Sequence, residues 1–261
     1  MQKVFPKATL VHRQDLTPNL IIIRLEPHIP YLFIPGQYCT IGIDGVLRPY
    51  SIASTPQDSY LELFIRCVKN GTLTSKLWDL RVGDEVTLLP KAKGIFTLEE
   101  KFEHHIMIST ATGLAPFMSI IRNYFRTRGP SDRHHNFFVF QGVSYQDELG
   151  YADELKAFYP ELTFIPAVSR PRDPRNTGWN GFGKRINRFS RWLLMDLGIS
   201  PEDSIIYLCG NPDMVNDLSQ KLTAHSFLKR INTRNPCAHR IPCFPDFKIK
   251  LESFWTEKNP A

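Results

Sequence analysis

The hydrophobic pattern of the chain changes near residue 100, and this change restricts the possible folds more than any other feature. Before it, short apolar or alternating runs such as Leu20–Leu25 and Tyr60–Arg66 are separated by closely spaced turns, which is typical of a closed barrel. After it, buried-type strands such as Ile106–Thr110 alternate with helical segments, which is typical of a doubly wound parallel sheet. The sequence therefore predicts two domains, an N-terminal antiparallel β-barrel over residues 1–100 and a C-terminal α/β domain over residues 101–261.

Further elements of each domain follow from the same patterns. In the first domain, Pro35–Tyr38 and Asp44-Gly45 are expected to form turns, and Val82–Leu89 a turn followed by a strand. The further strands expected in the second domain are Phe137–Phe140, Leu162–Val168 and Ile205–Cys209. The helices expected there are Phe117–Phe125, Tyr151–Phe158, Ser190–Leu197 and Asp213–Leu222. No element is predicted for Asn235–Pro245, which contains three prolines and two cysteines.

Composition excludes several classes of protein. With 261 residues, of which 42% are hydrophobic and 22% charged, the chain can form substantial cores and is not a disordered protein. Its five cysteines are odd in number and widely spaced, which argues against a disulfide framework or an iron–sulfur centre. A reducing, cytoplasmic setting is therefore expected. Because the N-terminus lacks the apolar region of a signal peptide and no apolar run approaches about 18 residues, no membrane span is expected.

The net charge is +6, from 32 basic and 26 acidic residues, which favours acidic partners. Nucleic acid is not among the expected partners, because the chain has no dense basic run with interleaved aromatic residues.

The segment Arg48–Ser54 carries the most chemistry in the first domain. Arg48 is a fixed cation suited to a phosphate or pyrophosphate, and Pro49 restricts the backbone around it. Tyr50 offers a flat aromatic face, and Ser51 a hydroxyl that can donate or accept a hydrogen bond. An edge strand with an ordinary surface arginine and a half-buried tyrosine explains the same residues without a ligand, and both interpretations stay open for the segment alone.

A second candidate anion site lies in Asn70–Trp78, where a glycine turn opens a short helix. Thr74 or Ser75 is the expected N-cap, and the free N–H groups of a helix start can bind an anion. A capped connector helix without a ligand is the alternative. With Arg48 nearby in the sequence, a phosphate shared by the two segments is the better account.

In the second domain, two strand-to-helix turns are expected at the carboxyl ends of parallel strands, where ligands of such sheets bind. They are Thr110–Pro116 and Cys209–Pro212. Taken alone, Cys209 is as easily explained as a small buried hydrophobic residue.

Four motifs in order resemble the ferredoxin–NADP reductase family, most closely its bacterial ferredoxin/flavodoxin reductases. They are Arg48-Pro49-Tyr50-Ser51, Gly71-Thr72-Leu73-Thr74, Thr112-Gly113-Leu114-Ala115-Pro116 and Cys209-Gly210-Asn211-Pro212-Asp213-Met214. The ending Glu252–Lys258 also resembles the bacterial tail, in which a glutamate is followed by an aromatic residue and a short extension. The resemblance implies an FAD-binding barrel, an NADP-binding α/β domain and a C-terminal tail that returns to the flavin.

The same resemblance implies the FAD contacts. Arg48 and the turn at Gly71–Ser75 would hold the pyrophosphate, Tyr50 would lie on one face of the isoalloxazine, and Ser51 would hydrogen-bond near N5. Phe254 would cover the other flavin face and Trp255 would lie beside the adenine, although a hydrophobic C-terminal anchor is the alternative for both. The full set expected to contact FAD is Arg48, Pro49, Tyr50, Ser51, Cys67, Val68, Lys69, Gly71, Thr72, Leu73, Thr74, Phe254 and Trp255.

The NADP contacts are implied in the same way. Arg170 and the pair Lys184 and Arg185 match the family's basic sites for the 2′-phosphate, which favours NADPH over NADH. Two departures are visible, because Ala111 replaces a family glycine and Ser144 stands where the family has a third arginine. The full set expected to contact NADP is Thr112, Gly113, Pro116, Arg170, Lys184, Arg185, Gly210, Asn211, Asp213 and Met214.

The catalytic residues implied by the resemblance are Ser51, Cys209 and Glu252. Cys209 would help to orient the nicotinamide, and Glu252 would handle a proton or orient a neighbour, with a solvated tail carboxylate as its alternative. No metal is expected.

The expected activity is electron transfer between NADPH and a one-electron carrier, by hydride transfer to flavin N5. The carrier would be an acidic ferredoxin or flavodoxin, and the enzyme is expected to be a monomer. Two alternatives remain, a reductase component of an oxygenase system and a non-catalytic flavin- or nucleotide-binding redox sensor.

Overall fold

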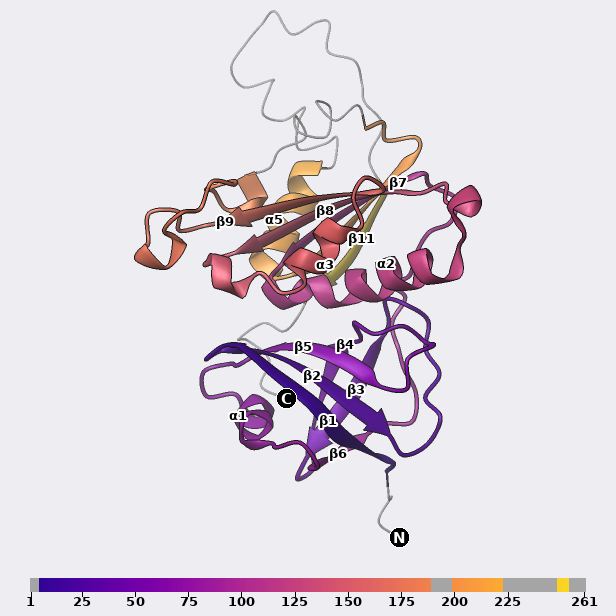
Figure 1. Ribbon diagram of the computed structural model, residues 1–261, viewed down its shortest axis with the longest axis vertical. Coiled ribbons are helices and arrows are strands. Elements are labelled where there is room, and N and C mark those ends of the chain that lie inside the picture. The colour runs from indigo at the N-terminus through magenta and orange to yellow at the C-terminus, as the bar shows by residue number, and fades with distance from the viewer. Residues whose placement is uncertain (1–4, 189–198, 223–247, 254–261) are drawn as a thin grey trace, which may run out of the picture. The chain divides into compact units, whose positions relative to one another are not determined.

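A computed structural model of the protein describes residues 5–188, 199–222 and 248–253 (Figure 1). The chain forms two compact units. The first comprises residues up to Leu98 together with Thr112–Arg133, and the second comprises Glu99–Ala111 and the residues from His134 onward. This grouping rests on packing within each unit, and the boundary near residue 100 that the sequence predicts stays a prediction. The expected helix at Ser190–Leu197 and the stretch Asn235–Pro245 lie outside the described residues.

The first unit contains a six-stranded antiparallel sheet in the order β4-β3-β6-β1-β2-β5. A bridge between Ile52 and Leu63 joins the chain just after β4 to β5, so the two ends of the sheet meet and the predicted barrel is confirmed. Its strands are β1 (Lys7–Thr17), β2 (Leu20–Pro27), β3 (Tyr38–Ile43), β4 (Val46–Ser51), β5 (Leu61–Arg66) and β6 (Glu85–Leu88).

Alternating side chains fill the barrel. Every second residue of β2, from Ile21 through Leu25, belongs to one cluster with Ile41 and Leu88 of neighbouring strands. The turn between β3 and β4 has φ of 49° at Asp44 and 80° at Gly45, the left-handed values that a two-residue hairpin turn requires. The hairpin expected from Asp44-Gly45 is therefore confirmed.

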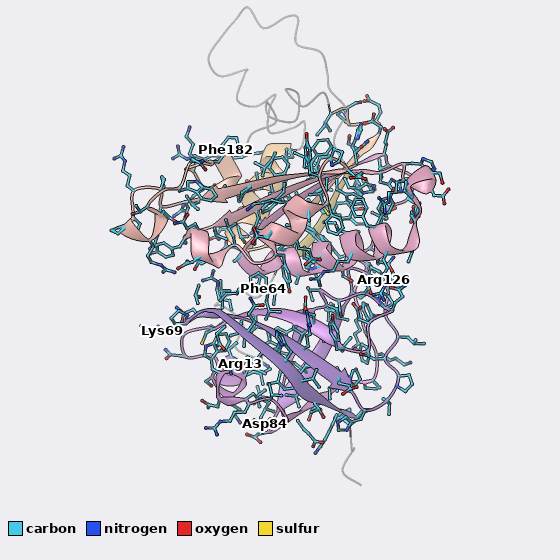
Figure 2. The ribbon with its side chains drawn as sticks, in the orientation of Figure 1. Arg13, Phe64, Lys69, Asp84, Arg126 and Phe182 are labelled. Carbon is cyan, nitrogen blue, oxygen red and sulfur yellow. The ribbon has the colours of Figure 1, made fainter. Side chains whose placement is uncertain are left out.

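Helix α2 (Ala115–Thr127) packs on the barrel through a buried ion cluster. The carboxylate of Glu62, whose residue is 1% exposed, accepts hydrogen bonds from Arg24 Nε at 2.8 Å and from Arg122 Nη1 at 2.7 Å. Burial alone would raise the pKa of Glu62, but Arg122 and Arg24 outweigh it, so the pKa lies below its ordinary value. Arg126, labelled in Figure 2, pairs with Asp58 at 2.7 Å and holds the same helix.

Two helices begin at residues other than those expected from the sequence. Helix α2 begins at Ala115 rather than at Phe117, because Pro116 fits the first turn, where its missing N–H is not needed. Helix α1 (Thr72–Asp79) has Gly71 as its N-cap, rather than Thr74 or Ser75. The Thr74 hydroxyl donates to the carbonyl of Val68, and the Ser75 hydroxyl to the carbonyls of Gly71 and Thr72.

The second unit contains a five-stranded parallel sheet in the order β11-β10-β7-β8-β9, which confirms the predicted doubly wound type of sheet. Its strands are β7 (His104–Thr110), β8 (Asn136–Val143), β9 (Leu162–Val168), β10 (Ser204–Gly210) and β11 (Lys248–Ser253). The α-helices among its described residues are α3 (Ala152–Ala157), which packs on β9, and α5 (Pro212–Leu222), which packs on β10 and β11. Short 3-10 helices across the two units are η1 (Ala111–Leu114), η2 (Pro130–Asp132), η3 (Gln146–Glu148), η4 (Pro174–Asn176) and η5 (Ile186–Arg188).

The core of the second unit lies between its sheet and α5. Ile106, Phe140, Ile206 and Leu208 of the strands pack with Leu218 of the helix. The parallel pairing aligns the carboxyl ends of β7, β10 and β11, so the residues that end these strands share one edge of the sheet. Among the described residues, no helix is long and apolar enough to span a membrane.

Candidate active site

The segment predicted to bind a flavin lies on β4 and the turn after it. Tyr50 is half-buried and packs against the barrel core, and burial raises its pKa above the ordinary value. Arg48 is half-buried and donates from Nη1 to the carbonyl of Leu47 at 2.8 Å. The edge strand therefore presents an aromatic ring and a cation in a fixed relation.

Ser51 supports a bound ligand most directly. Its Oγ is buried, and no hydrogen-bond partner for it exists among the described residues. A buried hydroxyl without a partner costs about 1–3 kcal/mol, so such groups are rare in proteins unless a ligand satisfies them. A flavin ring atom that accepts or donates a hydrogen bond fits this position, and the residues around it therefore fit FAD.

The glycine turn before α1 is tightly packed. A Cβ added at Gly71 would lie 2.3 Å from Thr74 Oγ1 and 3.0 Å from the carbonyl oxygen of Val68, so only glycine fits. Gly71 caps the helix with its backbone and no side chain bonds there, which leaves N–H groups of the first turn available to an anion. Lys69, labelled in Figure 2, lies in the same connection between β5 and α1.

Helix α1 lies against β3 and β4, which brings this turn to the strand that carries Arg48. An ion pair of 2.6 Å between Lys76 and Asp44 fixes the helix to the β3–β4 turn. The backbone N–H of Cys67 donates to the carbonyl of Asn19 at 2.9 Å, which holds the end of β5 to the turn between β1 and β2. The predicted FAD residues of the first unit thus gather on neighbouring elements.

The turn that begins at Ala111 adopts an unusual backbone. Ala111 has φ of 44°, in the left-handed region where the family glycine would be free of strain. Thr112 and Gly113 continue into η1, and Pro116 is buried in the first turn of α2. Ala111 therefore adopts the backbone of a glycine at a cost in strain.

In the second unit, Cys209 and Glu252 stand opposite each other on β10 and β11. Cys209 Sγ lies 4.0 Å from Glu252 Oε2, at the limit of a sulfur hydrogen bond. Burial, followed by the Glu252 charge, raises the pKa of the Cys209 thiol well above its ordinary value, and burial raises the pKa of Glu252 to about 7. Glu252 is thus partly shielded from solvent, and its role stays a prediction.

The turn after β10 packs closely on the end of β7. Gly210 has φ of 130°, and a Cβ there would lie 2.3 Å from Thr110 Oγ1, so the position requires glycine. The N–H of Asn211 donates to Thr110 Oγ1 at 2.8 Å. The side chain of Asn211 accepts from the N–H groups of Asp213 at 2.8 Å and Met214 at 3.3 Å. These two N–H groups are thus already satisfied, and a dinucleotide would have to use other atoms of the turn.

At the opposite edge of this sheet, Tyr145 connects two arginines. Arg170 Nη1 donates to the Tyr145 hydroxyl at 2.5 Å, and the Arg175 guanidinium lies 3.7 Å from the centre of the tyrosine ring. Arg175 also forms a two-pronged ion pair with Asp147, with both N–O distances at 2.7 Å. Sequence reasoning identified Arg170 but missed Tyr145 and Arg175; the only signal was an aromatic residue directly after Ser144 at a strand end.

The second predicted basic site lies beside the first. The segment at Phe182, labelled in Figure 2, runs along β9, and its carbonyl accepts from the N–H of Val168 at 2.9 Å. Gly183 lies close to Pro171, because a Cβ added at Gly183 would be 2.9 Å from Cβ of Pro171. Lys184 follows Gly183 and Arg170 precedes Pro171, so the two basic segments lie side by side. Lys184, Arg185 and Arg170 are all exposed.

Phe254 and Trp255 lie outside the described residues, so their predicted roles stay predictions. Within the described ranges, no group of three or more histidine, cysteine, aspartate or glutamate side chains could hold a metal ion.

Comparison with known proteins assigns both halves of the chain to domain families. Residues 7–93 match the oxidoreductase FAD-binding domain, and residues 107–220 match the oxidoreductase NAD-binding domain.

Individual relatives agree with these matches. A ferredoxin–NADP reductase of Pseudomonas aeruginosa is 32% identical over 223 residues, which is 77% of this chain and 82% of the relative. A flavodoxin/ferredoxin–NADP reductase of Escherichia coli is 30% identical over 206 residues, which is 75% of this chain and 82% of the relative. The crystal structure of a ferredoxin NADP+ reductase from Neisseria gonorrhoeae with bound FAD and NADP superimposes with a TM-score of 0.73 and 25% identity, covering 97% of this chain and 99% of that one.

Proposed function

The chain belongs to the ferredoxin–NADP reductase family, and on this premise we propose that it transfers electrons between NADPH and a small acidic one-electron carrier, a ferredoxin or a flavodoxin. The buried Ser51 hydroxyl without a partner is the observation that carries the proposal, because it lies within the motif that the family uses for its flavin. The enzyme is an FAD-binding, NADP-dependent oxidoreductase. That it acts as a monomer in the cytoplasm is part of the proposal.

When bound, FAD supplies the chemistry: it accepts hydride from NADPH and passes electrons on singly. The protein's contribution is to bind and orient. Arg48 and the N–H groups that follow Gly71 would hold the pyrophosphate, Tyr50 would pack against the ring system, and Ser51 would hydrogen-bond near N5. Because Ser51 and Tyr50 sit on a strand of the barrel, their positions are set before the cofactor arrives.

Cys209 and Glu252 act on the nicotinamide side. The thiol is fully buried and its pKa is raised, so Cys209 acts as a neutral orienting group rather than as a nucleophile. Glu252, with a pKa raised to about 7 by burial, can hold a proton or release it near neutral pH. The pair therefore combines a neutral sulfur surface with a group that takes up or gives a proton.

Selection of NADPH over NADH falls to the cations that follow β9. Arg170, Lys184 and Arg185 would bind the 2′-phosphate, and Tyr145 would hold the Arg170 guanidinium through its hydroxyl. Replacing Arg170 by alanine should raise KM for NADPH much more than KM for NADH. Equal effects on the two coenzymes would remove the 2′-phosphate assignment.

Two alternatives come from the sequence, a reductase component of an oxygenase system and a non-catalytic redox sensor. The two relatives described above are named as reductases of a ferredoxin or flavodoxin and not as components of an oxygenase system. The decisive test is made on purified protein: bound FAD seen in the absorbance spectrum, and NADPH-dependent reduction of ferricyanide and of a carrier. A colourless protein that takes up no FAD would refute the proposal.

A further inference from the structure

Three of the large apolar side chains that are exposed in the first unit lie on two segments that a glutamine side chain joins. Leu32 is 88% exposed, Ile34 58% and Ile95 88%. Leu32 and Ile34 lie in the loop between β2 and β3, and Ile95 lies after β6. We call these three residues the apolar ridge.

Side chains of the loop between β2 and β3 point alternately toward the barrel core and toward solvent. Tyr31 and Phe33 pack against the barrel core, whereas Leu32 and Ile34 between and after them face solvent. In an extended segment with one buried face, polar residues are expected at the solvent positions. This chain has leucine and isoleucine there, and large apolar side chains gathered on a surface indicate a binding site.

The side chain of Gln37 joins the two segments of the ridge. Its Oε1 accepts from the N–H of Ile34 at 2.9 Å, and its Nε2 donates to the carbonyl of Gly94 at 3.0 Å. Ile95 follows Gly94 directly, so the loop residue and the residue after β6 are held next to each other. Two backbone hydrogen bonds between Tyr38 and Lys93, at 2.9 and 3.0 Å, lock the same arrangement.

The charge at the edge of the ridge has one sign. Lys91 and Lys93 are exposed, and they share the outward face with Ile95 because the intervening Ala92 and Gly94 are half-buried. Neither lysine forms an ion pair with a carboxylate among the described residues. The segments 28–36 and 89–98 contain no aspartate or glutamate at all. The charged side chains of these two segments are therefore the lysines Lys91 and Lys93.

Hydrogen bonds also connect the ridge to the segment that is proposed to bind the flavin. The carbonyl of Gln37 accepts from the N–H of Ile52 at 3.1 Å, and Ile52 directly follows Ser51. One residue thus bonds to both segments of the ridge and to the segment that carries Arg48, Tyr50 and Ser51.

We propose that the apolar ridge, with Lys91 and Lys93 at its rim, is the docking surface for the small acidic electron carrier. The inference rests on the proposed function, because it identifies where the carrier of that reaction binds. Leu32, Ile34 and Ile95 form the dry centre of the interface, and the lysines steer the acidic partner and fix its orientation. The position next to the flavin-binding strand suits a partner that must receive electrons from the flavin.

The test separates carrier binding from flavin chemistry. The triple variant Leu32→Ser, Ile34→Ser, Ile95→Ser is compared with Val82→Ser, which removes a side chain that is 63% exposed elsewhere on the same unit. Steady-state rates are measured with NADPH and ferricyanide, and then with NADPH and a purified ferredoxin or flavodoxin. We expect the triple variant to raise KM for the carrier about tenfold or more, as for loss of central interface residues, with an unchanged ferricyanide rate. Val82→Ser should change neither value.

The lysines are tested by charge reversal. Lys91→Glu with Lys93→Glu should raise KM for the carrier at low salt, and the difference from the wild type should shrink at about 0.5 M salt, where charges are screened. Lys156→Glu, a reversal in the second unit, serves as the matched control and should have a much smaller effect. FAD content and Tm are recorded for every variant to show that each is folded.

The outcomes are distinct. If the wild type binds no FAD or reduces nothing with NADPH, the proposed function fails, and the docking proposal with it. If the wild type reduces the carrier and the triple variant has the same KM as Val82→Ser, only the docking proposal is overturned. A wild type that is dimeric in solution, with the triple variant monomeric and its KM for the carrier unchanged, would assign the ridge to a second copy of the chain and would likewise overturn it.

Discussion

The buried carboxylate of Glu62 makes the stability of the first unit depend on Arg122. We consider the substitution Arg122→Met, which keeps a long unbranched side chain and removes the charge. It deletes the 2.7 Å bond to Glu62 Oε1 and the 2.9 Å bond to the carbonyl of Ala53, and it leaves Arg24 on Glu62 Oε2. Glu62 would then be a buried carboxylate with one cation in place of two.

Removing one partner of a buried ion pair costs about 3–5 kcal/mol, because the remaining charge stays buried without compensation. Since Arg24 still bonds to Glu62, the lower end applies, about 3 kcal/mol at pH 7. In a unit of this size such a loss lowers Tm by roughly 10 °C. The half-exposed pair of Arg126 and Asp58 is the matched control, and Arg126→Met should cost about 1 kcal/mol or less.

The pH dependence gives the second check. In the wild type, the two arginines hold the pKa of Glu62 below its ordinary value, so the ion cluster contributes stability above the ordinary carboxylate pKa and loses it as pH falls through the folded pKa. In Arg122→Met, burial dominates and the pKa of Glu62 rises. Glu62 of the variant is therefore protonated in mild acid, which removes the poorly compensated buried charge and part of the loss in stability. The stability gap between variant and wild type should narrow as pH falls from about 7 to about 4.5.

The measurement is urea or thermal unfolding of the intact protein, followed by far-UV circular dichroism at both pH values. The reasoning is refuted if Arg122→Met costs no more than Arg126→Met at neutral pH. It is also refuted if the gap stays constant or widens in acid.

Three further predictions concern the active site. Ser51→Ala should slow hydride transfer from NADPH in stopped-flow measurements about tenfold or more, while making the FAD-free protein about 1 kcal/mol more stable because a buried hydroxyl without a partner is removed; Ser54→Ala, which deletes a 3.0 Å bond from the N–H of Glu62, should instead lower stability by about 1 kcal/mol, and a loss in both variants would contradict the argument. Glu252 has a pKa raised from 4.5 to about 7, so the folded state binds the proton more tightly, and the free energy of unfolding should fall by roughly 3 kcal/mol as pH rises between these values. Glu252→Gln should abolish this pH dependence of the free energy of unfolding in urea titrations. A variant with the wild-type pH dependence would refute the assignment to Glu252. Ala111→Gly should relieve the left-handed strain at φ of 44° and raise Tm, for a net gain of about 0.5–1 kcal/mol after the glycine entropy, whereas a lower Tm would show that the turn is unstrained.

The fold could be predicted from the sequence because its signals are local. The apolar run Leu20–Leu25, the Asp44-Gly45 turn and the strand-helix alternation after residue 103 each depend on neighbours in the chain. They gave the barrel and the parallel sheet. The helix starts were less well predicted, because the hydroxyls of Thr74 and Ser75 bond to backbone groups other than those of the helix start.

The strand β5 shows where local reasoning fails. Alternation in Tyr60–Arg66 predicts a half-buried strand, but every residue from Leu61 to Ile65 is buried, Glu62 included. Arg122 of α2, sixty positions later, supplies the charge that makes this possible. No pattern within β5 contains that information, so the prediction of a half-buried strand was wrong.

The candidate site divides in the same way. Motif matching found Arg48, Ser51, Cys209 and Glu252, because each lies at a strand end or in a short motif. The contacts of Tyr145 with the arginines after β9 join two loops about thirty positions apart, and only the folded chain brings them together. The grouping of such residues is a property of the tertiary structure.

The pairing of β11 with β10 fixes which residues of β11 lie opposite which residues of β10. Cys209 is opposite Glu252 because six consecutive residue pairs, from Ile205 with Lys248 to Gly210 with Ser253, are in register. Deleting one residue early in β11 would place Ser253 opposite Cys209 and turn Glu252 to the other face of the sheet. Directed-evolution libraries that change the length of this strand should therefore remove Glu252 from its place opposite Cys209, whereas substitutions that keep its length preserve the pairing.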